Sequence, residues 1–549
     1  MHDPPMHKFI ALVLTLSGAA HAAPDEAALV QSVYAHSNSR LLWSMHAQPT
    51  KQAGDLGDLL RTVDSYGLRP GDYGMDLITA RAGGWSAETP DADWSQYDFV
   101  MTRAAVRLIT HLHYGRIDPR SAGFELPEPR TDLDVAATVA ALASTADVAG
   151  TVTAAEPRFL HYALLKRALS RYRGLAADPT LTQLPGLGRK ALRAGDPYAG
   201  AAALRKLLAA EGDLVAAGER AAVAGDRAAV AGDRVGDDQT LDPALCEALQ
   251  RFQARHGLKV DGVLNAATFA ALTTPIARRV RQIELTLERW RWLPAFRAPP
   301  IIVNIPEFKL FAFNTMDDRA ASILQMPVIV GQAYRDKQTP IFIGDLKYVV
   351  FRPYWDIPRT IMLREMLPKM QADADYAQRN HLEIVDGEGD DANIVTSNAE
   401  GLAALAAGTV RLRQQPGDDN ALGLIKFLFP NAHNVYLHST PAHKLFAASR
   451  RAFSHGCIRV SDPVALAVHV LRNAAQAWDA DQIDAAMHNS EANNARVALR
   501  EPIPVMIFYI TAMASEAGPV LFFDDIYGHD SKLEALLHLA PVNSAATIR

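Results

Sequence analysis

Cysteine is scarce in this chain of 549 residues, which has only Cys246 and Cys457. Two cysteines cannot build a disulfide scaffold, so the fold has to rest on buried apolar surface. A net charge of −6 without a basic stripe argues against a nucleic-acid-binding protein. No apolar run reaches the length of a membrane span. What remains, with 49% hydrophobic and 21% charged residues, is a globular chain long enough for several domains.

The first residues predict an export signal rather than a part of the fold. An apolar run at residues 9–16 follows His7 and Lys8, and Ala20-His21-Ala22 is a small-x-small cleavage pattern. We therefore expect residues 1–22 to form a cleaved signal peptide, with no transmembrane segment after it. Export would place the protein in the periplasm of a Gram-negative cell or in an equivalent envelope space.

Reactive side chains gather at residues 434–462. Cys457 is preceded by His455 two residues earlier and by His438 nineteen residues earlier. A thiol near imidazoles has the parts for nucleophilic acyl chemistry, in which the thiolate attacks and a histidine moves the proton. The spacing does not decide which histidine is the base.

The local pattern places this cysteine on a connection between two elements. Alternation of apolar and polar residues predicts a strand that carries Tyr436 and His438 on one face. Asp462 followed by Pro463 predicts an N-cap and the first turn of a helix. Cys457 then lies on a loop between the strand region and the helix start, where chemistry is often located.

Gly456 and Arg459 support the same interpretation of Cys457. Glycine permits a positive φ and close approach of the backbone, which frees amide groups for an oxyanion site. The arginine charge, like a protonated imidazole, would lower the pKa of the thiol. Two plainer interpretations compete, namely a small buried hydrophobic cysteine and a zinc ligand. Zinc sites use more ligands at tighter spacing than this segment offers.

Fifteen residues separate His438 from the tetrapeptide Ser-His-Gly-Cys at residues 454–457, and Arg459 follows. This pattern resembles the signature of the L,D-transpeptidases of bacterial cell walls. The resemblance implies that Cys457 is the acylated nucleophile and that His438 is the general base. Arg459 would support the loop or hold a substrate carboxylate. The resemblance implies no metal and no organic cofactor.

The same resemblance assigns the surrounding residues. His455 and Gly456 would shape the oxyanion pocket. Ser439 stands where long members of the family often have an acidic residue, so a backbone carbonyl at 439 could orient His438 instead of a side chain. The tract around Trp355 would lie at the edge of the substrate groove. The substrate-binding candidates are Tyr436, Arg459, Trp355, Ser439 and Ser454.

Two helical regions are expected before the catalytic part. Residues 25–183 are rich in alanine and show helix-like apolar spacing. The phrases at residues 66–73 and 115–119 resemble the N-terminal scaffold of the long L,D-transpeptidases. The sequence alone predicts a helical scaffold domain there, without a constellation of catalytic groups.

Residues 184–276 predict a second, smaller helical unit. Its sequence Ala-Leu-Gln-Arg-Phe-Gln at 248–253, followed by a turn at Asp261 and Gly262, resembles the peptidoglycan-binding domain of many wall enzymes. Such a domain could bind the wall or act only as a spacer. Ala-Ala-Val-Ala-Gly-Asp-Arg occurs twice in tandem at residues 221–234, which predicts a flexible surface loop.

Residues 280–531 predict a mostly β catalytic domain. Strands are expected at residues 301–305, 309–313, 327–331, 341–343, 348–351, 504–511 and 520–523. A largely helical stretch at residues 360–380, kinked or divided by Pro368, begins an interruption of the β unit at about residues 360–430. The resemblance implies that this interruption is a capping subdomain that covers the cleft. Residues 532–549 would form a tail. The expected fold class is α+β and multi-domain, with the sandwich-like catalytic fold of the L,D-transpeptidases.

These expectations combine into one function, with alternatives. A periplasmic L,D-transpeptidase would form 3→3 peptidoglycan cross-links through a cysteine acyl-enzyme, release D-alanine and react with carbapenems. The same site could instead act as an L,D-carboxypeptidase or attach a protein to the wall. The protein could also be a wall-binding scaffold in which Cys457 is inert. Its partners would be peptidoglycan stem peptides and other wall-synthesis enzymes.

Overall fold

A computed structural model describes residues 25–38, 40–80, 85–86, 88–127, 133–188, 191–214, 239–316, 322–334, 336–516 and 518–538. The chain forms two compact units, Met1–Ala295 with Ile510–Arg549, and Phe296–Tyr509. The predicted signal peptide and the tandem repeat lie outside the described residues. Within the described ranges, no helix combines the length and the apolar character needed to cross a bilayer.

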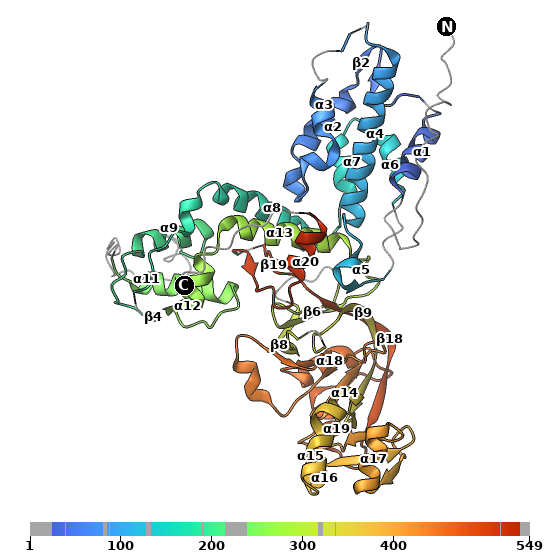
Figure 1. The fold of residues 1–549 in the computed structure, drawn as a ribbon, viewed down its shortest axis with the longest axis vertical. Coiled ribbons are helices and arrows are strands. Elements are labelled where there is room, and N and C mark those ends of the chain that lie inside the picture. Colours follow the sequence, from blue (N-terminus) through green and yellow to red (C-terminus); the bar gives the residue numbers. More distant parts are fainter. Residues whose placement is uncertain are drawn as a thin grey trace. The chain divides into compact units, whose positions relative to one another are not determined.

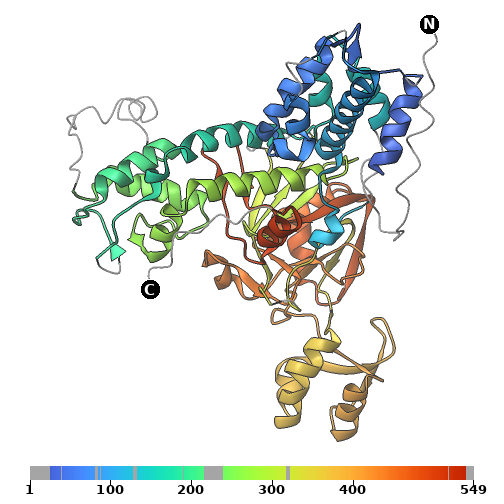
Figure 2. The same ribbon diagram turned by 45° about the horizontal axis from the view of Figure 1, so that its top comes forward.

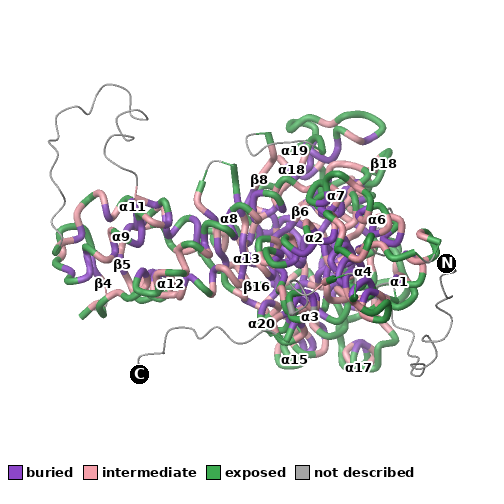
Figure 3. The backbone as a smooth tube through the Cα atoms, turned by 90° about the horizontal axis from the view of Figure 1, so that it is seen from above, coloured by how far each residue is buried: buried purple, intermediate pink, exposed green. Residues whose placement is uncertain are grey.

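The first unit begins with a helical domain, drawn in blue in Figure 1. Its main helices are α1 (Glu26–His36), α2 (Lys51–Arg61), α4 (Asp91–Tyr114), α6 (Val135–Leu142) and α7 (Val148–Ala154). Along α4, buried Met101, Ala105, Leu108 and Leu112 recur every three or four residues, so one stripe of the helix faces the core. Figure 3 shows buried positions along these helices. The predicted helical scaffold is confirmed.

Two long helices, α8 (Leu160–Ala176) and α13 (Ile276–Arg291), run side by side in this unit (Figures 1 and 2). The C-terminal helix α20 (His529–Leu536) packs on α13, where Arg289 and Asp530 form a fully buried ion pair at 2.5 Å. The predicted tail from residue 532 therefore begins inside a helix. The ends of the predicted catalytic domain, at 280 and 531, fall in this unit because α13 packs against α8 and α20 packs on α13.

The small helical domain consists of β4 (Ala191–Leu192), α9 (Ala201–Glu211), α11 (Pro243–Arg255), β5 (Leu264–Asn265) and α12 (Ala266–Leu272). Gln253 is buried at its centre. Its side-chain oxygen accepts from the amides of Asp261 and Gly262 at 2.9 and 2.8 Å, and its nitrogen donates to the Thr268 hydroxyl at 3.1 Å. The motif that carries the resemblance thus holds the domain's own fold together.

The second unit is built on one β-sheet. Its strands are β6 (Ile301–Asn304), β7 (Lys309–Ala312), β8 (Leu324–Gly331), β9 (Ile341–Phe351), β14 (Ile425–Leu428), β15 (Leu437–His438), β16 (Ala452–Ser454), β17 (Ile458–Val460) and β18 (Ala495–Phe508). Within this unit the order is β14-β15-β17-β8-β7-β6-β18-β9, with β16 beside β8. Because β14 also pairs with β9, the pairing closes on itself and protects strand edges.

The strand β9 differs from its prediction. Residues 341–343 and 348–351 were expected to form two strands, but both belong to one strand that pairs with β18 along its length. The partner β18 shifts register between Ala498 and Ile503, and this irregularity lets the pair bend without breaking. After β17, helices α18 (Pro463–Leu471) and α19 (Ala480–His488) follow. The Asp462 carboxylate accepts the Ala465 amide at 2.9 Å, as its predicted N-cap role requires.

A capping insertion projects from this sheet as a separate body (Figure 2, yellow). Its strands, in order, are β10 (Trp355–Asp356), β13 (Arg411–Gln414), β11 (Leu382–Asp386) and β12 (Asn393–Val395). Its helices are α14 (Arg359–Ile361), η4 (Met362–Met366), α15 (Leu367–Ala372), α16 (Tyr376–Arg379) and α17 (Ala399–Ala407). A small apolar core that includes Met362, Leu405 and Leu412 stabilises the insertion by itself.

The cap is narrower than predicted. Its own sheet ends at Gln414, and the next strand, β14, pairs with β9 and β15 in the main sheet instead of belonging to the cap up to about residue 430. The helical stretch predicted over residues 360–380 is divided, because η4 is a π-helical turn and Pro368 follows in α15. Single π turns inside helices often mark functional sites.

Candidate active site

The predicted nucleophile, Cys457, lies on the turn between β16 and β17. Ser454 fixes this turn, because its hydroxyl donates to the Cys457 carbonyl at 2.5 Å and accepts the Gly456 amide at 3.1 Å. Gly456 has a φ of 122°, a conformation that residues with a Cβ rarely adopt. The Ser-His-Gly-Cys sequence therefore folds into a fixed loop at the edge of the sheet.

A buried threonine ties this loop to the end of β8. The Thr339 hydroxyl donates to the Gly456 carbonyl at 2.8 Å and accepts the Gly331 amide at 2.9 Å. Gly331 leaves no room for a side chain, since a Cβ there would lie 2.0 Å from the Lys337 carbonyl oxygen. The nucleophile loop and the strand end are thus held in one fixed relation.

Strand pairing places four predicted site residues on one face of the sheet. β15 and β17 run parallel, with His438 opposite Arg459. Side chains alternate between faces along a strand, so Tyr436 and Cys457, two residues before these, share their face. The rings of Tyr436 and His438 lie 5.7 Å apart between centroids. The predicted shared face of Tyr436 and His438 agrees with this geometry.

His438 is buried and held in one tautomer. Its Nδ1 donates to the Ser439 carbonyl at 2.5 Å, and the Leu422 carbonyl also accepts from the ring. With the proton on Nδ1, Nε2 keeps its lone pair and is the basic nitrogen. Burial, followed by the nearby charge of Arg459, lowers the pKa of His438 to about 3. The imidazole is therefore neutral at physiological pH, as a general base has to be.

The Cys457 thiol is half-buried beside Tyr436. Both the backbone amide and the hydroxyl of Tyr436 donate to the sulfur, and the thiol lies 3.8 Å from the Asn434 carbonyl oxygen. Burial raises the pKa of Cys457, while these donors and the charges of Lys426 and Arg459 act in the opposite direction. The resting thiol is protonated at neutral pH, so a base has to remove its proton during attack.

A hydrogen-bonded chain runs from the cap to the sulfur. The side chain of Trp355, on β10, donates to the Tyr436 hydroxyl, and that hydroxyl donates to Cys457. Burial, followed by the Cys457 charge, raises the pKa of Tyr436 well above its usual value, so the phenol keeps its proton. The first strand of the cap sheet is thus in hydrogen-bond contact with the nucleophile through one tyrosine.

His455, the other candidate base, is engaged elsewhere. Its Nε2 lies 2.7 Å from the Glu365 carboxylate in the π-helical turn of the cap and 3.0 Å from the Lys337 ammonium. Burial would raise the pKa of Glu365, but the bonds to His455 and Lys337 outweigh it and lower that pKa. This arrangement favours His438 as the base and gives His455 the task of joining the loop to the cap.

The remaining predicted residues differ in exposure. Ser439 and Ser454 are buried, and their hydrogen bonds run to His438 and to the nucleophile loop, which favours positioning over the predicted contact with substrate. Arg459 is half-buried, and its Nε has no hydrogen-bond partner among the described residues. Burial lowers the pKa of Arg459, an effect that a bound carboxylate would relieve.

Sequence reasoning missed Lys426 and Glu365. Lys426 stands opposite His438 on β14, and its ammonium lies 4.0 Å above the ring centre of Tyr436. A lysine alternating with Ile425 and Phe427 could have indicated a polar face pointing at the site. No sequence pattern around Glu365 indicates a role in the site, because only the folded cap brings Glu365 to His455.

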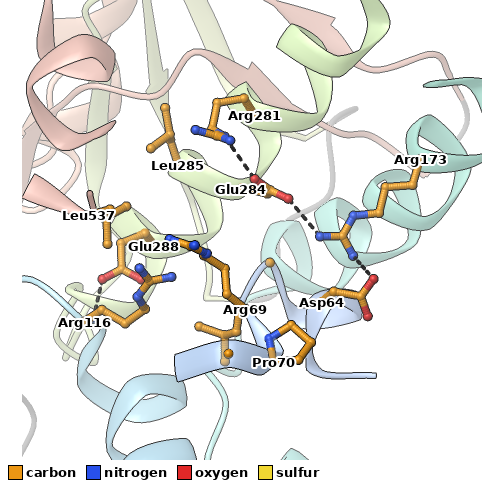
Figure 4. A pocket seen from close by; sticks show the side chains of 13 residues that line it. Asp64, Arg69, Pro70, Arg116, Arg173, Arg281, Glu284, Leu285, Glu288 and Leu537 are labelled. Atoms are coloured by element: carbon orange, nitrogen blue, oxygen red, sulfur yellow. Dashed lines mark hydrogen bonds and ion pairs between the residues drawn. The ribbon is translucent and has the colours of Figure 1, made fainter. Parts of the chain in front are cut away.

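A cavity in the first unit does not have the reactive side chains of this site. A space of about 380 Å³ in the first unit is lined by the two loop phrases of the scaffold and by α13. Figure 4 shows Arg173 between Asp64 and Glu284, with nitrogen–oxygen distances of 3.0 and 2.8 Å. No thiol or imidazole lines it. Its charges are largely satisfied by one another, so this cavity joins scaffold elements and offers no nucleophile.

The pKa shifts predict a broad pH optimum for acylation of Cys457. A His438 with a pKa of about 3 stays neutral, and so remains a base, as the pH falls from 7 toward 4. The raised thiol pKa keeps Cys457 protonated well above neutrality. We expect rapid-mixing mass spectrometry to give a nearly constant acylation rate between about pH 5 and about pH 8. A fall in rate centred near pH ~6.5 would show an ordinary imidazole and contradict the prediction.

A fixed thiol that shares a sheet face with a neutral imidazole defines the class of site used in nucleophilic acyl transfer. Comparison with protein families agrees with this class. Residues 299–478 match the "L,D-transpeptidase catalytic domain", residues 231–272 match the "Putative peptidoglycan binding domain", and residues 28–169 match the "Scaffold domain". The chain therefore contains an L,D-transpeptidase catalytic domain together with a peptidoglycan-binding domain.

Similarity to a curated protein supports the same class of site. The chain is 32% identical over 263 residues to a "Putative L,D-transpeptidase" of Haemophilus influenzae, an alignment that covers 48% of this chain and 50% of that protein. The chain spans about half the length of the curated relative it matches. The predicted L,D-transpeptidase catalytic domain and peptidoglycan-binding domain are confirmed by these matches. The predicted mixed α and β fold, with its helical scaffold and β-rich catalytic region, is confirmed by the matches and by the structure.

Proposed function

We propose that this protein is a periplasmic L,D-transpeptidase that forms 3→3 cross-links between peptidoglycan stem peptides. The observation that carries the proposal is the placement of Cys457 and His438 on one sheet face, with Nδ1 of His438 donating its proton to the Ser439 carbonyl oxygen. The peptidoglycan-binding match supports a wall substrate and an extracytoplasmic location. Cys457 and His438 carry out the bond formation and the proton transfers of both steps.

In the first step, the Cys457 sulfur attacks the carbonyl carbon of the third stem residue, a diamino acid, as its proton passes to Nε2 of His438. The tetrahedral intermediate collapses when the bond to the terminal D-alanine breaks. The leaving amine takes the proton from His438. D-alanine therefore departs with a free amino group, His438 is neutral again and a thioester remains. The Tyr436 hydroxyl, which donates to the sulfur, stabilises negative charge there in the thiolate-like state.

The oxyanion of the intermediate needs amide donors near the sulfur. We assign this task to the backbone around Gly456 and Cys457, as the sequence predicts. In this structure the Gly456 amide donates to the Ser454 hydroxyl, so it has to turn from that oxygen when substrate binds. The positive φ of Gly456 is compatible with such a turn, since glycine has the freest backbone.

In the second step, the side-chain amine of an acceptor stem attacks the thioester. His438 accepts a proton from that amine and returns one to the departing sulfur, which restores the thiol and forms the amide. The cap excludes water while it covers the cleft. This favours attack of the acceptor amine on the thioester over its hydrolysis by water. Its contacts with the site through Trp355 and Glu365 support this role.

Muropeptide analysis tests the proposal. Purified protein is incubated with bacterial sacculi, and the products are separated and sequenced by mass spectrometry. Dimers joined through two diamino acids are expected. Trimmed peptides without dimers would instead identify a carboxypeptidase, and muropeptides joined to a protein lysine would identify an attachment enzyme. If the sacculi are unchanged although the protein is folded, the protein is a wall-binding scaffold without this activity.

A further inference from the structure

A row of charged side chains crosses the sheet beside the nucleophile. Register places Arg496 opposite Val350, Val350 opposite Lys426, Lys426 opposite His438, and His438 opposite Arg459. Directly paired residues point to the same face of a sheet, so all five share the face of the active site. The row runs from β18 through β9, β14 and β15 to β17, and it is positively charged at both ends.

A polar pocket opens at the far end of this row. The pocket measures about 150 Å³ and is lined by Val350, Tyr354, Asp356, Gly389, Asp390, Arg413, Lys426, Leu428, Asn494 and Arg496. Three of these side chains are cationic and two are anionic. The pocket is therefore built from the main sheet on one side and from the base of the cap on the other.

The acidic groups of the pocket are already engaged. Asp390 accepts two bonds from Asn494, at 2.7 and 2.9 Å, and Asp356 pairs with Arg411 of the cap. One cation is engaged as well, since Arg413 pairs with Glu383 at 2.8 Å. These contacts leave the pocket with an excess of positive charge.

Lys426 and Arg496 supply that excess. The Lys426 ammonium lies 4.0 Å above the Tyr436 ring and the Arg496 guanidinium 5.4 Å above the Tyr348 ring. Within the described part of the chain, neither side chain has a carboxylate at ion-pair distance. Burial lowers the pKa of Lys426, and Asp356 opposes this only through space. A bound anion would compensate the ammonium directly.

We propose that this pocket binds a carboxylate at the far end of the donor's diamino-acid side chain, and that Lys426 and Arg496 select for it. The inference rests on the proposed function and names the feature of the donor that the site recognises. Lys426 is two strands from Cys457, or roughly 10 Å along the sheet at the backbone. A side chain that extends six bonds from the attacked carbonyl spans about 7 Å, and the length of the lysine covers the rest.

The test compares two tetrapeptide donors that differ only in this carboxylate, free in one and converted to a carboxamide in the other. Release of D-alanine without an acceptor isolates the donor step. Wild-type protein is expected to prefer the free acid by about 10- to 100-fold in the second-order rate constant for single-turnover release of D-alanine, because charge-assisted hydrogen bonds are stronger than neutral ones. Lys426→Met is expected to reduce that preference to within about 3-fold, and Lys426→Arg to retain part of it.

Two further variants keep the test decisive. Arg496→Gln changes an exposed residue, so it should fold even if a Lys426 variant does not, and it should lower the preference in the same direction. Lys347→Met removes an equal charge from an exposed position of β9 outside the pocket and should keep the wild-type preference. The ratio between donors separates selection from a general loss of thiol reactivity, which would slow both equally.

Two outcomes would overturn the inference. Equal use of both donors by the wild type, or a preference that survives in Lys426→Met and Arg496→Gln, would show that the pocket does not read the carboxylate. Release of D-alanine from both donors would in that case still support the proposed function. Failure of the folded wild type to release D-alanine from either donor would contradict the proposed function itself.

Discussion

Replacing Cys457 with alanine is expected to abolish covalent capture of a carbapenem and to lower D-alanine release by at least about 10³-fold. The sulfur is the atom that forms the new bond, and the β-lactam carbonyl is a strained acyl group that the same thiol can open. Intact-protein mass spectrometry would show the wild type shifted by one inhibitor mass and the variant unshifted. The variant should fold, because the loop is held by Ser454 and Thr339 instead of by the sulfur.

The chain contains its own control for this experiment. Cys246 is a free cysteine on α11 of the small helical domain, with a pKa raised by burial. Cys246→Ala should keep both the adduct and the activity of the wild type. An adduct that persisted in Cys457→Ala and disappeared in Cys246→Ala would move the nucleophile to another domain and refute the site described here.

Replacing His438 with glutamine is expected to slow acylation by about 10²- to 10⁴-fold. Glutamine keeps a donor for the Ser439 carbonyl but supplies no basic nitrogen to a thiol whose pKa is raised by burial. The loss should shrink at high pH, where the thiol ionises without help. Rates of acylation measured from neutral to alkaline pH would show this partial recovery.

His443→Gln is the matched control, because that histidine is exposed on the 3-10 helix His443–Ala447 and takes no part in the site. It should behave as the wild type. A His438→Gln variant with a wild-type rate would eliminate His438 as the base. A large loss in His455→Gln would then be needed to sustain acid–base catalysis by the second histidine.

Much of the nucleophile segment could be predicted because its signals are local. Alternation along the strand placed Tyr436 and His438 on one face, and the Asp462 cap with Pro463 fixed the start of the following helix. The possibility that a carbonyl at Ser439 orients the histidine was also local, since it concerns adjacent residues. Such features depend on backbone geometry over a few residues, which short motifs largely determine.

The rest of the site depends on pairings between distant segments. Lys426 faces His438 because β14 pairs with β15, and Arg496 joins the row because β18 pairs with β9. Two predictions were wrong for the same reason: β9 was divided into two strands, and the cap was extended to about residue 430. Both errors concern strands whose pairing partners, β18 for β9 and β9 for β14, lie far away in the sequence. The contact between Glu365 and His455 requires the π turn of a folded cap.

The cap begins and ends at adjacent places. Its first and last strands pair with each other, with Trp355 opposite Gln414 and Asp356 opposite Arg413, so the two crossing points of the polypeptide are neighbours. An insertion with such a narrow neck can be shortened, enlarged or exchanged between chains while the closed sheet keeps its register. Evolution could therefore retune which region of the wall reaches the thiol by replacing one module, leaving the catalytic loop untouched.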